Sequence, residues 1–179
     1  LDLRLNPHRG QSAAQFLRKL TQAQLAELLT DYADEPQAER LAQALIEAGG
    51  REPIATTVQL AHLIRRVVRE SCPPDLLEET TRTTLQRTFQ ALRIAVNDEL
   101  RVLDQFLAYL PHCLRPGGRV AILTFHSGED RRVKKAFQQG HREGVYARVA
   151  EDPIRPSFAE RRDNPRSASA KLRWAVKAG

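Results

Sequence analysis

The chain has 179 residues, of which 41% are hydrophobic, and a formal net charge of +6. This length is sufficient for one sizeable core or two small ones. No run of 18 apolar residues occurs, and the amino terminus lacks a charged-then-apolar pattern, so neither a membrane span nor a secretory signal is expected. Cys72 and Cys113 lie far apart without metal-ligand spacing, which favours reduced thiols in a cytoplasmic protein and no metal site.

The charge is unevenly distributed along the chain. Residues 1–80 hold 9 Lys and Arg against 12 Asp and Glu, whereas residues 81–179 hold 19 against 10. A basic half beside an acidic half predicts a nucleic-acid partner, although aromatic residues are too few for a single-strand stacking platform. The chain has no methionine and begins with Leu1, so we expect it to be part of a longer protein.

Residues 11–71 are predicted to form an all-helical unit of short helices after an extended piece at residues 1–5. Capping residues, a proline in a first turn and Gly or Pro stops mark the individual helices. The predicted starts are Ser12, Thr21, Pro36 and Thr56, and the predicted stops are Leu20, Gly49-Gly50 and Cys72-Pro73-Pro74.

Residues 73–83 are predicted to be a connector, and residues 84–110 one helix of about 28 residues. Its apolar stripe recurs every three or four residues, as expected for packing along a sheet. Asn97 lies off this stripe and therefore needs solvent or a polar partner. The stripe consists of Leu85, Phe89, Leu92, Val96, Leu100, Leu103, Leu107 and Leu110.

The central element of the sequence is the apolar run 120–125, which follows the turn Pro116-Gly117-Gly118. Its length and composition predict a strand buried on both faces, as in parallel sheets covered by helices. The carboxyl edge of such a sheet is where ligands bind. His126 and Ser127 stand at that edge, before a predicted helix over 128–139.

Ser127 has two interpretations. With Asp130 three residues later it resembles a capping box, which would make it purely structural. Alternatively it faces a ligand together with His126. A nucleophilic His126–Ser127 pair, as in a small hydrolase, is disfavoured because neighbouring side chains on a strand point to opposite faces.

Further strands are predicted at 145–150 and 169–177, to form one sheet with 118–125. The last strand alternates strictly, with Leu172, Trp174 and Val176 on one side, which indicates a half-solvated strand antiparallel to the others.

Five segments, spread from one end of the chain to the other, resemble the bacterial 16S rRNA cytosine-N4 methyltransferase family (RsmH or MraW). Gly128 departs from that family, in which a larger apolar residue, commonly Leu, is usual, and the connector 71–86 lacks a His-Pro step. The segments are LDLRL at 1–5 with RGQS at 9–12, RTFQALRIAVNDEL at 87–100, LRPGGR at 114–119, FHSGEDR at 125–131 and NPRSASAKLR at 164–173.

The resemblance implies an α/β fold: a Rossmann-like, S-adenosylmethionine-dependent methyltransferase sheet interrupted by an all-helical insertion. Residues 1–9 would be an extended lead-in, 10–80 the helical insertion subdomain and 84–179 the carboxyl-terminal half of the methyltransferase domain. The cofactor-binding residues are expected in an amino-terminal half preceding Leu1, because the closely spaced glycines of a cofactor loop are missing here.

The implied function is methylation of the exocyclic N4 amine of a cytidine in the 16S ribosomal RNA of the small subunit, with S-adenosyl-L-methionine as cofactor. From their positions at the edge of the central strand and off the apolar stripe of the helix, we expect His126, Ser127 and Asn97 to be catalytic and to face one cleft. A truncated, non-catalytic RNA-binding or interaction relative is the alternative. The residues expected to contact RNA phosphates are Arg87, Arg93, Arg131, Arg166, Lys171 and Arg173.

Overall fold

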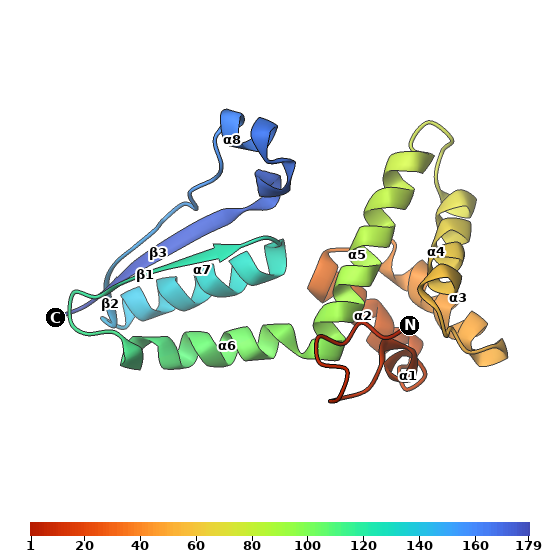
Figure 1. Ribbon diagram of the computed structural model, residues 1–179, viewed down its shortest axis with the longest axis horizontal. Helices are drawn as coiled ribbons and strands as arrows, with labels where there is room; N and C mark the ends of the chain where they lie inside the picture. Colours follow the sequence, from red (N-terminus) through yellow and green to blue (C-terminus); the bar gives the residue numbers. More distant parts are fainter. The chain divides into compact units, whose positions relative to one another are not determined.

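The computed structural model describes all 179 residues, and the chain divides into two compact units, Leu1–Glu99 and Leu100–Gly179. The division falls after Glu99 because the helix over 77–97 packs on the helices that precede it. The first unit holds α1 to α5, and the sheet with its helices belongs to the second (Figure 1).

The regular elements of the first unit are all helices, as predicted for residues 11–71. Ser12, Thr21 and Thr56 are N-caps, as their positions in the sequence indicated. Each accepts a hydrogen bond from the backbone of a Gln three residues later, whose side chain bonds back to the cap. The helices are α1 (Ala13–Leu17), α2 (Gln22–Ala33), α3 (Ala38–Arg51), α4 (Thr57–Ser71) and α5 (Leu77–Asn97).

The core of this unit is formed by the apolar sides of α2, α3, α4 and α5. Leu25, Leu29, Leu41, Leu60 and Leu92 are all inaccessible to solvent. Burying one such side chain contributes about 1.5–3 kcal/mol. Because all four helices contribute to one cluster, the unit has a closed hydrophobic core.

Four predicted helix bounds differ from the structure. Helix α1 ends at Leu17 instead of Leu20, and α3 begins at Ala38, so Pro36 lies in the turn before this helix. Helix α3 does not stop at Gly49-Gly50 but continues to Arg51, since neither glycine adopts a positive φ. Helix α5 starts at Leu77, inside the predicted connector. The turn after Pro73 and Pro74 leads directly into it, with the amides of Leu76 and Leu77 donating to the two proline carbonyls.

The prediction of a single helix over 84–110 is also wrong, because the helix is interrupted at Asp98. Asp98 has φ 55° and ψ 36°, a left-handed conformation that Asp tolerates better than most residues. Its amide closes α5, and α6 (Glu99–Tyr109) starts at the next residue. The apolar period continues across the break and therefore gave no sign of it.

The second unit is a three-stranded sheet with helices. Its strands lie in the order β1-β3-β2, and β3 is antiparallel to both neighbours, as predicted for the last strand. The elements after α6 are η1 (Leu110–Cys113), β1 (Arg119–Thr124), α7 (Ser127–Arg142), β2 (Tyr146–Val149), α8 (Phe158–Asp163), η2 (Pro165–Ser169) and β3 (Lys171–Lys177).

The expectation that β1 is buried on both faces in a parallel sheet is not met. Strand β1 is an edge strand that pairs only with β3, and its side chains alternate between accessible and less accessible. Helix α7 packs on all three strands (Figure 1), and the cluster beneath it includes Val133, Phe137 and Ala175. On the other face Leu123 is 52% exposed, because no element of this unit covers it.

Candidate functional site

The turn between β1 and α7 is built by a capping interaction that lies one residue earlier than the sequence predicted. His126, not Ser127, is the N-cap, and its Nδ1 accepts the amide of Glu129 at 3.4 Å. The Glu129 carboxylate accepts the amides of Phe125 at 2.9 Å and His126 at 3.4 Å. Ser127 is the first residue of α7, so the predicted Ser127–Asp130 capping box is corrected to His126–Glu129.

The capping interaction holds the His126 ring inside the turn. Its Nε2 atom lies 3.3 Å from Glu129 Oε1, within ion-pair distance, but is buried without a well-formed hydrogen bond. Burial of Glu129 favours the neutral acid, yet the hydrogen bonds from His126 and from the Phe125 amide outweigh it and lower the pKa of this carboxyl. The turn therefore carries an ionised carboxylate directly beside the imidazole.

Asp130 joins the same turn to β3. Its Oδ1 accepts Arg173 Nε at 2.7 Å, and its Oδ2 lies 3.2 Å from Lys171 Nζ. Burial of the Asp130 carboxyl opposes ionisation, but Arg173 and Lys171 more than compensate and lower its pKa. Only 4% of Arg173 is exposed, so this predicted RNA contact is instead a buried partner of Asp130.

The other predicted phosphate contacts lie in two units. In the second unit, Arg131 and Arg166 are exposed, on α7 and η2 respectively. In the first unit, Arg93 makes a two-point ion pair with Glu99, at 2.8 and 2.9 Å. Arg87 is half-buried. Burial raises the pKa of the Glu35 carboxyl, and the positive charge of Arg87 partly opposes that rise. Of the six predicted phosphate contacts, only Lys171 and Arg173 share a partner, which is Asp130.

Asn97 lies at the end of α5 and makes three hydrogen bonds within the first unit. Its Nδ2 donates to the carbonyls of Leu3 and Arg93, both at 2.8 Å, and its Oδ1 accepts the Leu5 amide at 2.7 Å. Leu3 has φ 66°, which is uncommon for a residue with a side chain. Asn97 therefore has the polar partners it was predicted to need, and they fix the amino-terminal segment 1–5.

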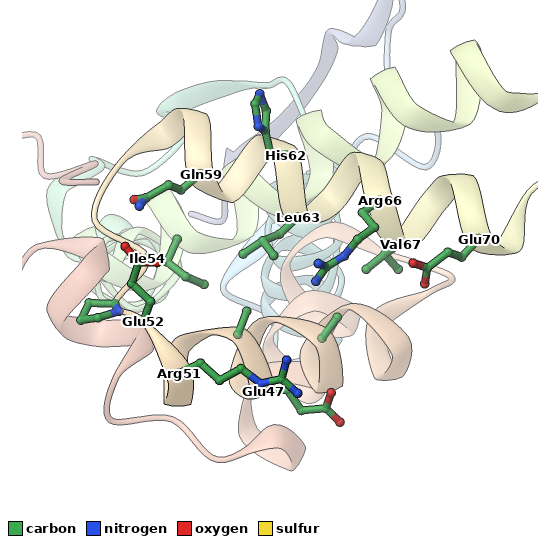
Figure 2. Close-up of a pocket in the computed structure, with 13 residues that line it drawn as sticks. Glu47, Arg51, Glu52, Ile54, Gln59, His62, Leu63, Arg66, Val67 and Glu70 are labelled. Carbon is green, nitrogen blue, oxygen red and sulfur yellow. The ribbon is translucent and has the colours of Figure 1, made fainter.

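A groove of about 600 Å³ separates part of α3 from α4 (Figure 2). It has an apolar floor that includes Leu63 and Val67, and charged side chains of both signs line it. Because two arginines are offset by three glutamates, the groove does not select for a polyanion such as RNA. None of the predicted site residues lines it. The charged lining residues are Glu47, Arg51, Glu52, Arg66 and Glu70.

The roles of Glu129 and Asp130 were not predicted from the sequence. A His followed three residues later by Glu is the only available signal of the cap, and His is not one of the usual N-cap residues. No local pattern indicates that Asp130 pairs with Arg173, because the two are 43 positions apart.

No helix of the structure is both long enough and apolar enough to cross a membrane.

The chain resembles known proteins over almost its whole length. The chain is 50% identical over 179 residues to "Ribosomal RNA small subunit methyltransferase H 1" of Lachnoclostridium phytofermentans, covering 99% of this chain and 49% of that protein. It is also 50% identical to "Ribosomal RNA small subunit methyltransferase H 2" of Alkaliphilus metalliredigens, again with 99% of this chain covered and 51% of the relative.

A more distant relative, "Ribosomal RNA small subunit methyltransferase H" of Acidobacterium capsulatum, is 40% identical over 177 residues, with 99% of this chain and 57% of the relative covered. The chain spans about half the length of the curated relatives it matches. The sequence model of the MraW methylase family matches residues 1–178. This chain therefore belongs to the MraW methylase family.

Proposed function

We propose that this chain is part of a methyltransferase that transfers a methyl group to the exocyclic N4 amine of a cytidine in the 16S RNA of the small ribosomal subunit. The observation that carries the proposal is the family match over residues 1–178, together with relatives named as small-subunit ribosomal RNA methyltransferases. A ribosomal substrate assigns the protein to the cytoplasm.

The chemistry sets three requirements for such an enzyme. The N4 amine is a poor nucleophile, because its lone pair is delocalised into the ring. The base must leave its stack, the amine must be held in line with the reacting methyl carbon, and a proton must be accepted as the new bond forms. We assign this step to the His126–Glu129 pair. Nδ1 of His126 accepts the Glu129 amide, so the proton of the neutral ring lies on Nε2, and the basic group of the pair is the Glu129 carboxylate 3.3 Å from it.

The second unit supports the assignment of residues 100–179 to one half of a Rossmann-like sheet. Strands β1 and β2 run in the same direction and are connected through α7. Strand β3 lies between them and is antiparallel to both. An apolar strand with an unpaired edge is a liability in an isolated sheet. A further strand beside β1, supplied by the remainder of the longer protein, would pair that edge.

The uncovered face of the sheet supports the same assignment. A hollow of about 720 Å³ lies there, and its lining includes Ala121, Leu172, Trp174 and Val176. Arg148 lies 5.6 Å from the centre of the Trp174 ring. Additional helices from the remainder of the protein would bury this apolar surface, as in α/β folds, where helices cover both faces of a mostly parallel sheet.

The residues of this chain do not fit S-adenosylmethionine by themselves. A cofactor loop needs closely spaced glycines immediately after a strand. The close pairs here are Gly49-Gly50, inside α3, and Gly117-Gly118, which precede β1. We therefore assign the residues that bind the cofactor to the rest of the protein.

The charge of the second unit fits an RNA partner. Residues 100–179 hold 16 Lys and Arg against 8 Asp and Glu, a net charge of +8. Such a surface attracts RNA phosphates without selecting a base. The exposed Arg131 and Arg166 are the contacts we retain from the predicted set within this unit, with the partly exposed Lys171 beside them.

The test of the proposed function is a replacement chimera. The matching residues of the Lachnoclostridium phytofermentans relative are exchanged for this chain, and the chimera is incubated with labelled S-adenosylmethionine and unmethylated small subunits. We expect label in 16S RNA as N4-methylcytidine, identified by mass spectrometry of nucleosides, and a loss in the His126→Ala variant at unchanged circular dichroism. Label on another base contradicts the proposed target. No label from a folded chimera that binds RNA contradicts the proposal and favours the non-catalytic alternative.

The cofactor assignment has its own measurement. Calorimetric titration of the 179-residue chain with S-adenosylmethionine is expected to give weak binding or none. An affinity in the low micromolar range would show that the chain holds the cofactor without further residues, and the assignment of that site to the rest of the protein would be wrong.

A further inference from the structure

We propose that Arg173 is a positioning residue, which acts through Asp130 to hold His126 in place at the end of β1. The inference rests on the proposed function, in which His126 belongs to the reacting site. Arg173 lies on β3, whereas Asp130 and His126 lie at the start of α7 and in the turn before it. Their connection therefore joins two segments that are distant in the sequence.

The ion pair is built with defined geometry. Arg173 Nε and Nη2 lie 2.7 and 3.4 Å from the two carboxylate oxygens of Asp130, and Nη1 donates to the Glu151 carbonyl at 3.3 Å. Lys171 Nζ supplies a further donor to Asp130 at 3.2 Å. Arg173 is 4% exposed and Asp130 is 8% exposed, so water has little access to the pair and cannot easily replace either partner.

The first turn of α7 transmits this constraint to the imidazole. The Asp130 amide donates to the His126 carbonyl at 3.2 Å. Glu129, the adjacent residue, donates its amide to His126 Nδ1 and accepts the amides of Phe125 and His126. Fixing Asp130 against β3 thus fixes the backbone and the ring of the cap together.

Gly128 confines the ring from another direction. A Cβ atom at this position would lie 3.2 Å from His126 Nδ1 and 3.3 Å from its Cε1, which is tighter than ordinary contact. The imidazole consequently rests against the backbone of Gly128, and a side chain there would force the ring to move. Gly128→Ala is therefore a second way to displace His126 while Asp130 and Arg173 remain intact.

A purely stabilising ion pair is the competing explanation, and buried pairs are weak evidence for stability by themselves. The two explanations differ in what a double variant does. Removing one partner leaves an unpaired buried charge, whereas Asp130→Asn with Arg173→Met removes both charges and can recover stability. If the role is positioning, recovery of stability does not return His126 to its original environment.

The experiment records the His126 imidazole resonances of the 179-residue chain by NMR at one fixed pH, together with the thermal midpoint. We expect the ring nitrogen shifts to change in Arg173→Met, Asp130→Asn and Gly128→Ala, and to stay changed in the double variant even where its midpoint recovers. The matched control is Asp104→Asn, which breaks the exposed ion pair with Arg132 of α7 and should leave His126 unchanged.

Unchanged His126 resonances in the single variants, or resonances that recover together with stability in the double variant, would overturn the inference. A kinetic arm in the replacement chimera separates it from the proposed function. Misplacing a reacting group by about 1 Å can cost on the order of 100-fold in rate, so we expect a loss of that size in kcat for Arg173→Met, with KM for the small subunit changed about twofold or less. Displaced resonances with unchanged kcat would support Arg173 as the support of His126 and reject His126 as part of the reacting site.

Discussion

In the helical unit, apolar side chains from α2, α3, α4 and α5 converge on one closed core, whereas in residues 100–179 the sheet is covered on one face only. Val133 and Phe137 of α7 are buried against that face, while Leu123 on the other remains half exposed. The first unit therefore buries its apolar side chains against residues of its own. The second unit leaves apolar surface uncovered on one face of its sheet, and its polar contacts at the β1–α7 turn join the start of α7 to β3.

The largest expected effect is the loss of a core side chain in the helical unit. Leu41 is inaccessible to solvent, and Leu41→Ala should destabilise the unit by about 2–5 kcal/mol through lost burial and the cavity left behind. Urea unfolding followed by far-UV circular dichroism measures this loss. Val58→Ala, at a position 61% exposed on α4, is the control and should stay within about 0.5 kcal/mol of the original chain. Equal effects of the two variants would mean that the closed core is not what stabilises this unit.

A smaller loss is expected where the amino-terminal segment joins α5. Asn97→Ala removes one acceptor and two donated hydrogen bonds and should cost about 1–3 kcal/mol, concentrated on residues 1–5. Hydrogen exchange of the Leu5 amide should accelerate. Asn97→Asp keeps an acceptor for that amide but loses both donors, so its Leu5 exchange should remain closer to the original. Unaltered exchange in Asn97→Ala would remove the fixing role assigned to this side chain.

The two units should respond to pH in opposite directions. Burial raises the pKa of Glu35 above its ordinary 4.5, so its contribution to the helical unit is present below that pH and is lost as pH rises through the raised value. The pKa of Asp130 lies below the ordinary 3.8, so its contribution to the second unit is present above that pH and is lost as pH falls through the lowered value.

Two optical signals can follow these two dependences. The single tryptophan, Trp174, lies in β3 and its fluorescence reports on the second unit, while most far-UV ellipticity comes from the helical unit. Glu35→Gln should flatten the pH dependence of the ellipticity transition, and Asp130→Asn that of the fluorescence transition. A pH dependence that survives the matching substitution would assign it to other groups.

The smallest effect is expected on the open face of the sheet. Leu123→Thr replaces a side chain that is 52% exposed by another with good strand propensity, so the chain itself should change by no more than about 0.5 kcal/mol. In the replacement chimera, where we infer that this face is covered, the same substitution should cost about 1–3 kcal/mol. Similar values in both proteins would indicate that the face stays open, and the comparison between closed and open units would then apply to the complete protein as well.

Much of the helical unit could be predicted because its signals are local. Ser12, Thr21 and Thr56 each begin a helix by bonding to an amide three residues later, a distance that the sequence displays directly. The break at Asp98 could not be predicted in this way. It lies at one residue with a left-handed backbone, next to Asn97, whose partners in segment 1–5 are more than 90 positions away.

The candidate site shows the same division. The position of His126 and Ser127 after an apolar strand was visible in the sequence, and the strand ends at Thr124, two residues before His126. Which of the two residues caps α7 was decided by the backbone geometry of the turn. His126 is extended, with φ −137° and ψ 164°, so its ring can reach the Glu129 amide, whereas Ser127 is already helical.

The sequence by itself determined the family, the short helices of residues 11–71, the three strands and the basic character of the second half, because composition, hydrophobic period and capping residues act over a few positions. Only the tertiary structure decided that Arg173 is buried on Asp130 instead of facing solvent, and that β1 lies at an edge. Charge and hydrophobicity specify what a side chain can bind, but the partner it meets depends on segments that folding brings together from distant parts of the chain.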